Sequence, residues 1–252
     1  MKILLNISYV GTAYCGYQVQ KNGISIQQRL NEAAKALFGF DCDIVGCSRT
    51  DRGVHANMFC ATVSKHTQNG IDSTIPEEAL PRAFNSYLPG DIAVTSAKYV
   101  DDTFHARYGV KSKEYVYKLY NAPLHDPFLN GRVWHYKEYI SDEKLRKMNE
   151  AASLFCGRHD FSSFMASGSK ITDAVREVMS AKVDRKGEII EFTVSADGFL
   201  YNMVRIMMGT LVSVAEGKIE PEQIPNIIEA RDRALAGMTA PADGLYLNRV
   251  EY

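Results

Sequence analysis

The residues best suited to chemistry lie in one short polar stretch, residues 46–56, which reads GCSRTDRGVHA between two strand-like runs. Within it Asp51 lies between two arginines, Arg49 and Arg52. A nearby cation favours the charged form of a carboxyl group and lowers its pKa. An ionised carboxylate can act as a nucleophile or a base, whereas a general acid needs an apolar pocket. We therefore predict that Asp51 acts as an anion, with a solvated turn carrying incidental charges as the alternative.

A second candidate is Arg205, the only charged residue between Phe199 and Ala215. This run is apolar nearly all round, which predicts a helix buried on most faces. An arginine there either extends its head to solvent or meets a buried acid. Gly209, one turn later, leaves room for close backbone approach and favours a packed functional position for Arg205.

Aromatic and basic side chains gather around the strand expected over residues 114–120. The pattern alone favours core packing for Tyr115 on this strand, although an exposed aromatic would stack a base. Phe104, His105 and Arg107 come just before it. Their interleaving suits phosphate contacts with base stacking, and a solvated basic loop is the alternative.

No motif points to a cofactor. The six histidines lack the spacing of a metal site, and no glycine pattern matches a phosphate loop or a dinucleotide fingerprint. The five cysteines are odd in number and lack CxxC spacing, which predicts reduced thiols. We therefore expect neither a metal nor a redox cofactor.

The composition is typical of a globular protein in the cytoplasm. The chain has 252 residues, of which 46% are hydrophobic and 23% charged. No apolar run approaches the roughly 18 residues of a membrane span, and the first residues resemble neither a signal nor a transit peptide. The net charge is −1, so a site for nucleic acid must arise from local clustering of basic groups.

Hydrophobic periodicity predicts an α+β chain with two halves, residues 1–108 and 109–252. In the first half a helix begins at the Ser25–Gln28 capping box. A second helix, capped by a Thr74–Glu77 box, is expected from about Pro76 to Tyr87, with Pro81 bending or splitting it. The strands of this half are expected over residues 2–9, 44–45, 59–64 and 92–100. The resulting order is the split β-α-β arrangement of ferredoxin-like and RNA-recognition folds.

The second half repeats this outline without detectable sequence repetition. A hairpin is predicted about residues 184–187, and residues 121–136 are expected to form a loop. The predicted helices run from Ser141 to Gly157, over residues 199–215 and over residues 221–235. A last strand is expected to begin at Gly244.

The motifs together resemble the TruA family of tRNA pseudouridine synthases. Residues 49–56 match its signature R-T-D-x-G-V-H-A. One departure is Cys47-Ser48, where the family typically has Ala-Gly. Because serine lacks the backbone freedom of glycine, this departure affects the expected fine geometry of the loop, while Asp51 stays in register. Supporting matches run in order through the chain at residues 14–18, 88–94, 104–107, 114–117, 160–164, 203–205 with Gly209, and 244–247.

The resemblance implies two ferredoxin-like, RRM-like halves with mixed, largely antiparallel sheets, joined into a pseudouridine synthase fold with the active-site cleft between them. It implies conversion of uridine to pseudouridine at positions 38, 39 and 40 of the tRNA anticodon stem-loop, with Asp51 as nucleophile and Arg205 as its ion-pair partner. Tyr115 would stack on the target uracil. Arg49 would help hold the nucleotide outside the helix, because a base inside a duplex is out of reach.

The resemblance also places a set of side chains against the tRNA and implies a homodimer that clamps one tRNA across both subunits. A groove shared by two near-neutral chains can still be basic. Three chemical paths remain open for Asp51: addition to uracil C6, attack on the anomeric carbon, or removal of a ribose proton. A non-catalytic tRNA-binding or folding module is the alternative function. An acid/base hydrolase that uses Asp51 is disfavoured, because the sequence offers no convincing second carboxylate. The residues that the resemblance implies to face the tRNA are Phe104, His105, Arg107, Ser169, Lys170 and Leu245.

Overall fold

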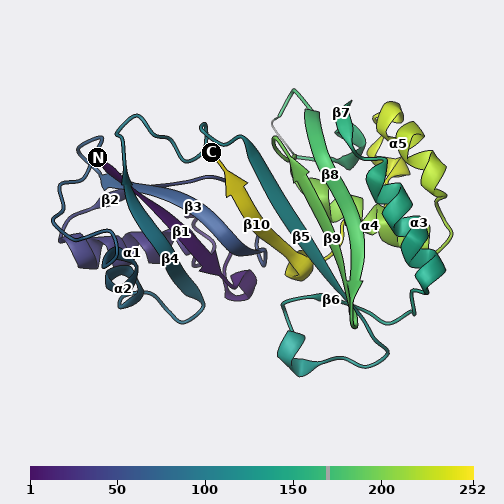
Figure 1. Cartoon of the computed structure of the whole chain (residues 1–252), viewed down its shortest axis with the longest axis horizontal. Coiled ribbons are helices and arrows are strands. Elements are labelled where there is room, and N and C mark those ends of the chain that lie inside the picture. The colour runs from purple at the N-terminus through teal and green to yellow at the C-terminus, as the bar shows by residue number, and fades with distance from the viewer. Residues whose placement is uncertain (169–170) are drawn as a thin grey trace. The chain divides into compact units, whose positions relative to one another are not determined.

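The computed structural model describes residues 1–168 and 171–252 (Figure 1). Its internal contacts divide the chain into two units, residues 1–111 with 247–252 and residues 112–246. Among the described residues, the pairs formed by the first nine strands are antiparallel, apart from one parallel pair in the second unit. The predicted α+β class with largely antiparallel sheets is confirmed.

The sheet of the first unit is built around β1 (Lys2–Tyr9), whose alternating Ile3, Leu5 and Ile7 are fully buried. β1 lies between β4 (Ile92–Val100) and β3 (His55–Lys65), and β2 (Cys42–Gly46) pairs with residues 61–65 of β3. α1 (Ile26–Phe38) lies between β1 and β2 in the sequence, and α2 (Leu80–Asn85) between β3 and β4. This is the predicted split β-α-β arrangement.

The start of α1 matches the sequence prediction only in part. The Ser25 hydroxyl accepts a hydrogen bond from the Gln28 amide at 3.2 Å, and Gly39 ends the helix at φ +76°. The Gln28 side chain does not reach back to complete the capping box, since it donates to Glu32 at 2.9 Å. One side-chain cap is enough to satisfy an orphan donor of the first turn.

The second helix is shorter than predicted. α2 begins at Leu80, because Glu77 accepts a hydrogen bond from the Tyr99 amide at 2.6 Å and is engaged by β4 instead of a helix start. Pro81 therefore falls in the first turn of α2, where its missing N–H breaks no helical bond. The predicted helix start near Pro76 and the predicted bend at Pro81 are both wrong.

In the second unit, β5 (Ser112–Asn121) pairs with β9 (Ile189–Ala196), which pairs with β8 (Val175–Lys186), and β7 (Gly157–Asp160) forms the far edge. β8 and β9 form the predicted hairpin, but pairing continues through Lys186, so the turn is shorter than predicted. β6 (Trp134–Tyr136) runs parallel to β5 within the segment expected to be a loop. Three residues are too few to show a strand period.

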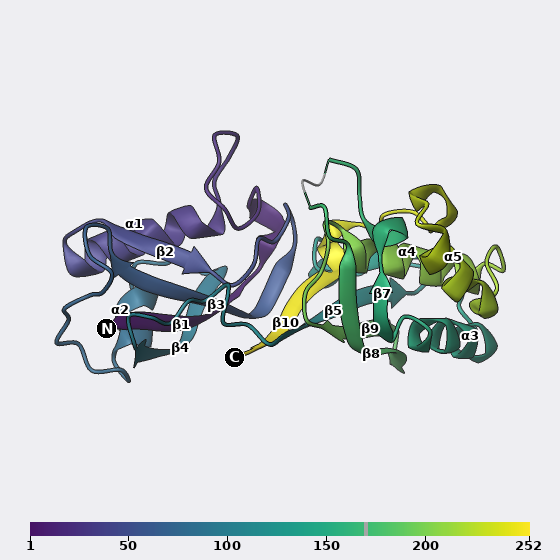
Figure 2. The same cartoon turned by 90° about the horizontal axis from the view of Figure 1, so that it is seen from above.

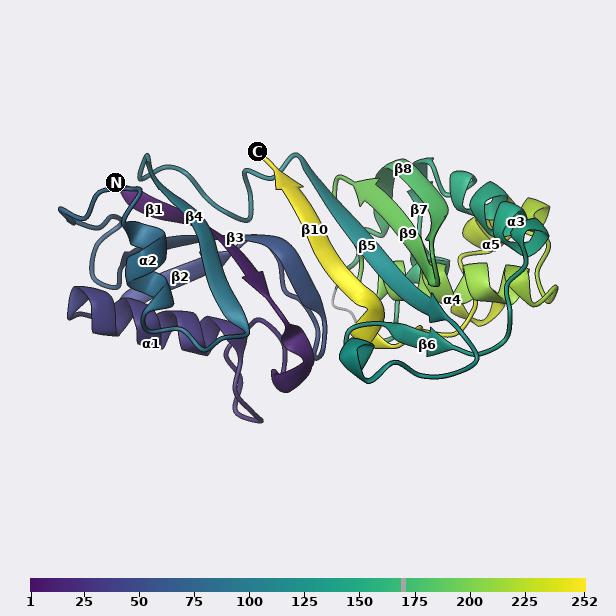
Figure 3. The same cartoon turned by 60° about the horizontal axis from the view of Figure 1, so that its bottom comes forward.

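Three α-helices belong to the second unit (Figure 3): α3 (Asp142–Ser153), α4 (Met203–Ala215) and α5 (Ile224–Ala230). Eleven residues of α4 are buried, as predicted. α4 begins later than expected because Asn202 has φ +59°, and α5 ends early because Arg231 has φ +53°. Gly157 begins β7 and does not close α3, which ends at Ser153.

The last strand, β10 (Leu245–Glu251), continues into the first unit from residue 247 onward. There β10 neighbours β3, and the Asn57 side chain donates to Asn248 at 2.8 Å. The predicted strand from Gly244 is therefore present, beginning one residue later.

Candidate active site

The loop that carries Asp51 is held by backbone contacts within the first unit. The Thr50 carbonyl accepts from the Tyr17 amide at 3.1 Å, and the Thr50 hydroxyl is hydrogen-bonded to the Tyr9 phenol at 2.8 Å in a buried position. The Val54 amide donates to the Asp51 carbonyl at 3.1 Å, and Gly53 has φ +81°. These contacts close a turn directly after Asp51 whose third residue needs positive φ, which glycine adopts without strain.

A glycine facing this turn permits very close backbone approach. A Cβ on Gly11 would lie 2.0 Å from the Val54 carbonyl oxygen, and the Gly11 amide donates to Nδ1 of the fully buried His55 at 3.0 Å. His55 therefore holds the loop in place through its ring. The only sequence signal for this contact is Gly11, which lies far from the loop in the sequence. Its role becomes visible only once the strands are paired.

Asp51 is half-buried and lines a polar pocket of about 350 Å³ formed within the first unit. Arg49 and Arg52 are exposed, and neither has a hydrogen-bond or ion-pair partner in the described part of the chain. The flanking arginines therefore form no ion pair with Asp51. Their guanidinium groups remain available to an anionic ligand.

The Cys47-Ser48 departure does not strain the loop. Among the described residues, Asn202 and Arg231 alone combine a side chain with positive φ, so Ser48 occupies backbone space open to any residue. Cys47 is fully buried, and its amide donates to the Cys60 carbonyl at 2.8 Å, which extends the pairing of β2 with β3. Burial raises the pKa of the Cys60 thiol to about 11.

Arg205 lies on α4 in the second unit, half-buried in an otherwise apolar helix. Its Nε donates to the Ala240 carbonyl at 2.7 Å, and its Nη1 donates to the Asn202 side chain at 2.8 Å. The backbone carbonyl of Arg205 accepts from the Ala240 amide at 3.1 Å. These two acceptors therefore fix the plane of the guanidinium, whereas a solvent-exposed arginine has no such fixed orientation.

Gly209 explains how the chain comes so near to Arg205. A Cβ at this position would lie 1.8 Å from the Met238 carbonyl oxygen, so residues 237–240 pass directly against α4. The Gly237 amide also donates to the Thr210 hydroxyl at 2.9 Å. The close approach that the sequence pattern indicated for Gly209 is present in the structure.

Tyr115 on β5 is 7% exposed and packs edge-on against Phe199, with ring centroids 5.0 Å apart and planes at 86°. This is the core packing that the strand pattern alone favoured. Leu245, at the start of β10, is also 7% exposed. Ser169 and Lys170 lie outside the described residues.

The segment with Phe104, His105 and Arg107 belongs to the first unit and divides into two parts. The Phe104 ring lies 5.0 Å from that of Tyr252, and Nδ1 of His105 accepts from the Arg107 amide at 3.1 Å. Tyr108 is 78% exposed, with the Arg107 guanidinium 5.8 Å from its ring. Phe104 is thus an anchor, while Arg107 and Tyr108 present a cation and an aromatic ring to solvent.

Comparison with known proteins gives a consistent result. Residues 6–109 and 151–252 match a family model described as tRNA pseudouridine synthase. The tRNA pseudouridine synthase A of Thermoanaerobacter sp. (strain X514) is 42% identical over 250 residues, covering 99% of each chain. The protein of the same name from Acetivibrio thermocellus is 43% identical with the same coverage. That of Staphylococcus saprophyticus is 38% identical over 99% of this chain and 90% of its own. The chain belongs to the tRNA pseudouridine synthase family.

Membership of this family makes the chain an enzyme of the isomerase class and confirms the resemblance seen in the motifs. Among residues 1–168 and 171–252, no three His, Cys, Asp or Glu side chains gather as a metal site. Within the same residues, no helix has both the length and the apolar character needed to cross a membrane.

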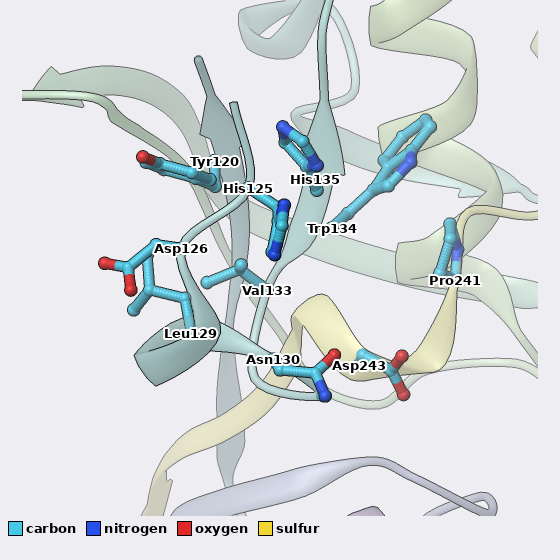
Figure 4. Close-up of a pocket in the computed structure, with 11 residues that line it drawn as sticks. Tyr120, His125, Asp126, Leu129, Asn130, Val133, Trp134, His135, Pro241 and Asp243 are labelled. Atoms are coloured by element: carbon cyan, nitrogen blue, oxygen red, sulfur yellow. The ribbon is translucent and has the colours of Figure 1, made fainter. Parts of the chain in front are cut away.

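The tRNA pseudouridine synthase fold also holds a pocket of about 260 Å³ in the second unit that sequence patterns had not indicated. Figure 4 shows the rings of His125, His135 and Trp134 above Asn130 and Asp243. His135 Nε2 lies 2.9 Å from the Ala122 carbonyl oxygen. Two carboxylates, of Asp126 and Asp243, line this pocket, and their charge disfavours a phosphate ligand.

Proposed function

We propose that the chain converts uridine to pseudouridine at positions 38, 39 and 40 of the tRNA anticodon stem-loop, with Asp51 as the nucleophile. The observation that carries this proposal is the placement of Asp51 in a backbone-clamped loop on the wall of a polar pocket. A clamped carboxylate meets the reacting atoms with little reorganisation. The names of the relatives, tRNA pseudouridine synthase A, support tRNA as the substrate.

Arg205 is proposed to be the ion-pair partner of the Asp51 carboxylate. Its guanidinium is oriented by the Ala240 carbonyl and the Asn202 side chain, which supports a fixed cation aimed at an anion. Tyr115 is proposed to stack on the target uracil. Arg49, exposed and without a partner among the described residues, is proposed to hold the flipped nucleotide outside the helix.

The wider tRNA contacts are proposals as well. Arg107 presents a cation beside the exposed ring of Tyr108, which supports phosphate contact and stacking by the segment with Phe104 and His105. Leu245, Ser169 and Lys170 are proposed to complete the tRNA-binding surface. We propose a homodimer in the cytoplasm, since a groove shared by two copies can be basic although each chain carries a net charge of −1. The functional division is proposed as residues 1–108 for the Asp51 loop and 109–252 for the rest of the site.

The test is tritium release from C5-labelled uridine in unmodified tRNA. The intact protein should release tritium, and Asp51→Asn should lower the rate by more than about 10⁴-fold, as loss of a nucleophile does, while tRNA affinity stays within about threefold. Asp72→Asn, which alters an exposed carboxylate of the same unit, is the matched control.

Two results would count against this proposal. Turnover persisting in Asp51→Asn would remove Asp51 as nucleophile. Tight tRNA binding by the intact protein without any tritium release would favour the non-catalytic tRNA-binding module.

A further inference from the structure

The pocket beside Asp51 has two walls from different parts of the first unit. Residues 15–20 form one wall, and Thr50, Asp51 and Arg52 form the other. Its volume of about 350 Å³ lies within the range of about 300–1,000 Å³ seen for small-ligand sites. The pocket beside the Asp51 carboxylate is therefore large enough to hold a small ligand.

The first wall is a fixed structure, although it belongs to a loop that protrudes narrowly beside the start of α1 (Figure 2). The Cys15 amide donates to the Ile24 carbonyl at 2.9 Å, and the Gln20 side chain donates to the Cys15 carbonyl at 2.6 Å. The Val19 amide donates to the Gln27 side chain at 3.0 Å. The base of this loop is thus pinned to itself and to α1.

The two walls are also joined directly. The Tyr17 amide donates to the Thr50 carbonyl, and a Cβ on Gly16 would lie 2.7 Å from that same oxygen. Only a glycine permits this approach. Any ligand in the pocket therefore meets residues 15–20 and Asp51 in one fixed relation, independent of the second unit.

Two side chains of the pocket remain unused by the fold. Gln18 and Arg52 are exposed and have no hydrogen-bond or ion-pair partner within the described ranges, 1–168 and 171–252. By contrast, the Gln20 side chain is hydrogen-bonded to the Cys15 carbonyl, and the Thr50 hydroxyl is hydrogen-bonded to the Tyr9 phenol. A guanidinium binds a phosphate through two parallel N–H donors, and a carboxamide offers a donor and an acceptor to a base edge.

We infer that this pocket holds the nucleotide next to the target uridine, with Arg52 on its phosphate and Gln18 on its base edge. The inference rests on the proposed function and adds a determinant of substrate choice to it. Arg52 occupies the one position of residues 49–56 that the signature R-T-D-x-G-V-H-A leaves open. A residue there can therefore differ between enzymes without changing the chemistry at Asp51.

The phosphate contact is tested by a double-mutant cycle. The substrates are tRNAs with a single target uridine, carrying a neutral methylphosphonate either 5′ or 3′ of it. The proteins are wild type, Arg52→Ala and Arg52→Lys, with Arg82→Ala as a control that removes an exposed arginine of α2 outside the pocket. KM and kcat are measured by tritium release.

We expect Arg52→Ala to raise KM about tenfold, the loss typical of one charged hydrogen bond, with kcat within about twofold of wild type. Arg52→Lys should recover part of the loss, because it keeps the charge without the paired donors. One of the two methylphosphonates should raise the wild-type KM similarly and add little in Arg52→Ala. Penalties that add fully at both positions, or an unchanged KM, would overturn the inference.

The same cycle is run on tRNA affinity in the Asp51→Asn background, which needs no turnover. A wild-type protein that releases no tritium refutes the proposed function, while the affinity cycle still decides whether Arg52 contacts the phosphate. For Gln18, the base beside the target is varied. Gln18→Ala should flatten the differences in kcat/KM among the four bases, and an unchanged profile would remove Gln18 from the inference.

Discussion

Asp51 and Arg205 are positioned by different kinds of structure. Asp51 lies on a loop of the first unit that is held by main-chain hydrogen bonds. Glycines also let neighbouring backbone approach this loop more closely than any side chain would permit. Arg205 lies on a buried helix of the second unit, where two acceptors orient its side chain. The first arrangement is sensitive to added atoms, and the second to removed ones.

After loss of the Asp51 carboxylate itself, the largest effect is expected from removing the Arg205 side chain. Arg205→Ala should lower kcat by about 10²–10³-fold, the range for loss of one preorganised electrostatic group, with tRNA affinity nearly unchanged. Arg205→Lys should recover little, because lysine has no planar fork for the Ala240 carbonyl and the Asn202 side chain. Single-turnover rates and filter-binding affinities separate the two effects.

Asn202→Gly provides the graded control for this prediction. Glycine keeps the left-handed backbone at φ +59° while removing one of the two acceptors. Its kcat should fall between those of wild type and Arg205→Ala. A variant at Arg205 that loses affinity alone would contradict an orienting role at the reaction centre.

The next effect comes from adding one methyl group in each region. Gly209→Ala places its Cβ 1.8 Å from the Met238 carbonyl. It should destabilise the protein by about 1–3 kcal/mol, although alanine in a helix normally stabilises by about 1 kcal/mol. Gly11→Ala places its Cβ 2.0 Å from the Val54 carbonyl and should reduce kcat as well, since the turn after Asp51 must move.

Thermal unfolding and initial rates measure both glycine variants. Gly90→Ala serves as control, because a Cβ there meets no atom within 4 Å. A higher melting temperature for Gly209→Ala, or full activity for Gly11→Ala, would show that the neighbouring backbone yields without cost.

The smallest effect concerns a pair outside both regions. The Asp43 carboxylate lies 2.7 Å from His66 Nδ1 and raises the His66 pKa above its ordinary 6.5. Stabilisation by this pair is complete below pH 6.5 and is lost as the pH rises through the raised pKa. NMR titration should show the His66 pKa falling back toward 6.5 in Asp43→Asn, with kcat unchanged. An unaltered His66 titration would show that the hydrogen bond does not form in solution.

Local periodicity was enough to predict much of the framework. Alternating residues placed strands at Lys2–Tyr9 and Ile92–Val100, and the apolar run around Arg205 predicted its buried helix. The polar density around Asp51 marked the loop without any structural information. These features depend on near neighbours in the chain, which the sequence displays directly.

What sequence could not supply was set by distant contacts. Glu77 caps no helix because its carboxylate accepts a hydrogen bond from the Tyr99 amide of β4. A glycine is required at position 11 only because the Val54 backbone packs against it. The acceptors of Arg205 include a main-chain carbonyl at Ala240, which carries no residue signature. Arg49 and Arg52 precede and follow Asp51 in the sequence, yet neither forms an ion pair with it among the described residues.

The return of residues 247–252 to the first unit has a consequence for synthesis on the ribosome. Tyr252 packs on Phe104 and donates to the Ala106 carbonyl at 2.8 Å, so the first unit lacks these contacts until the whole second unit has been translated. Domains often fold in the order of their synthesis. Here the unit whose synthesis begins first is completed only after residues 112–246 have been made.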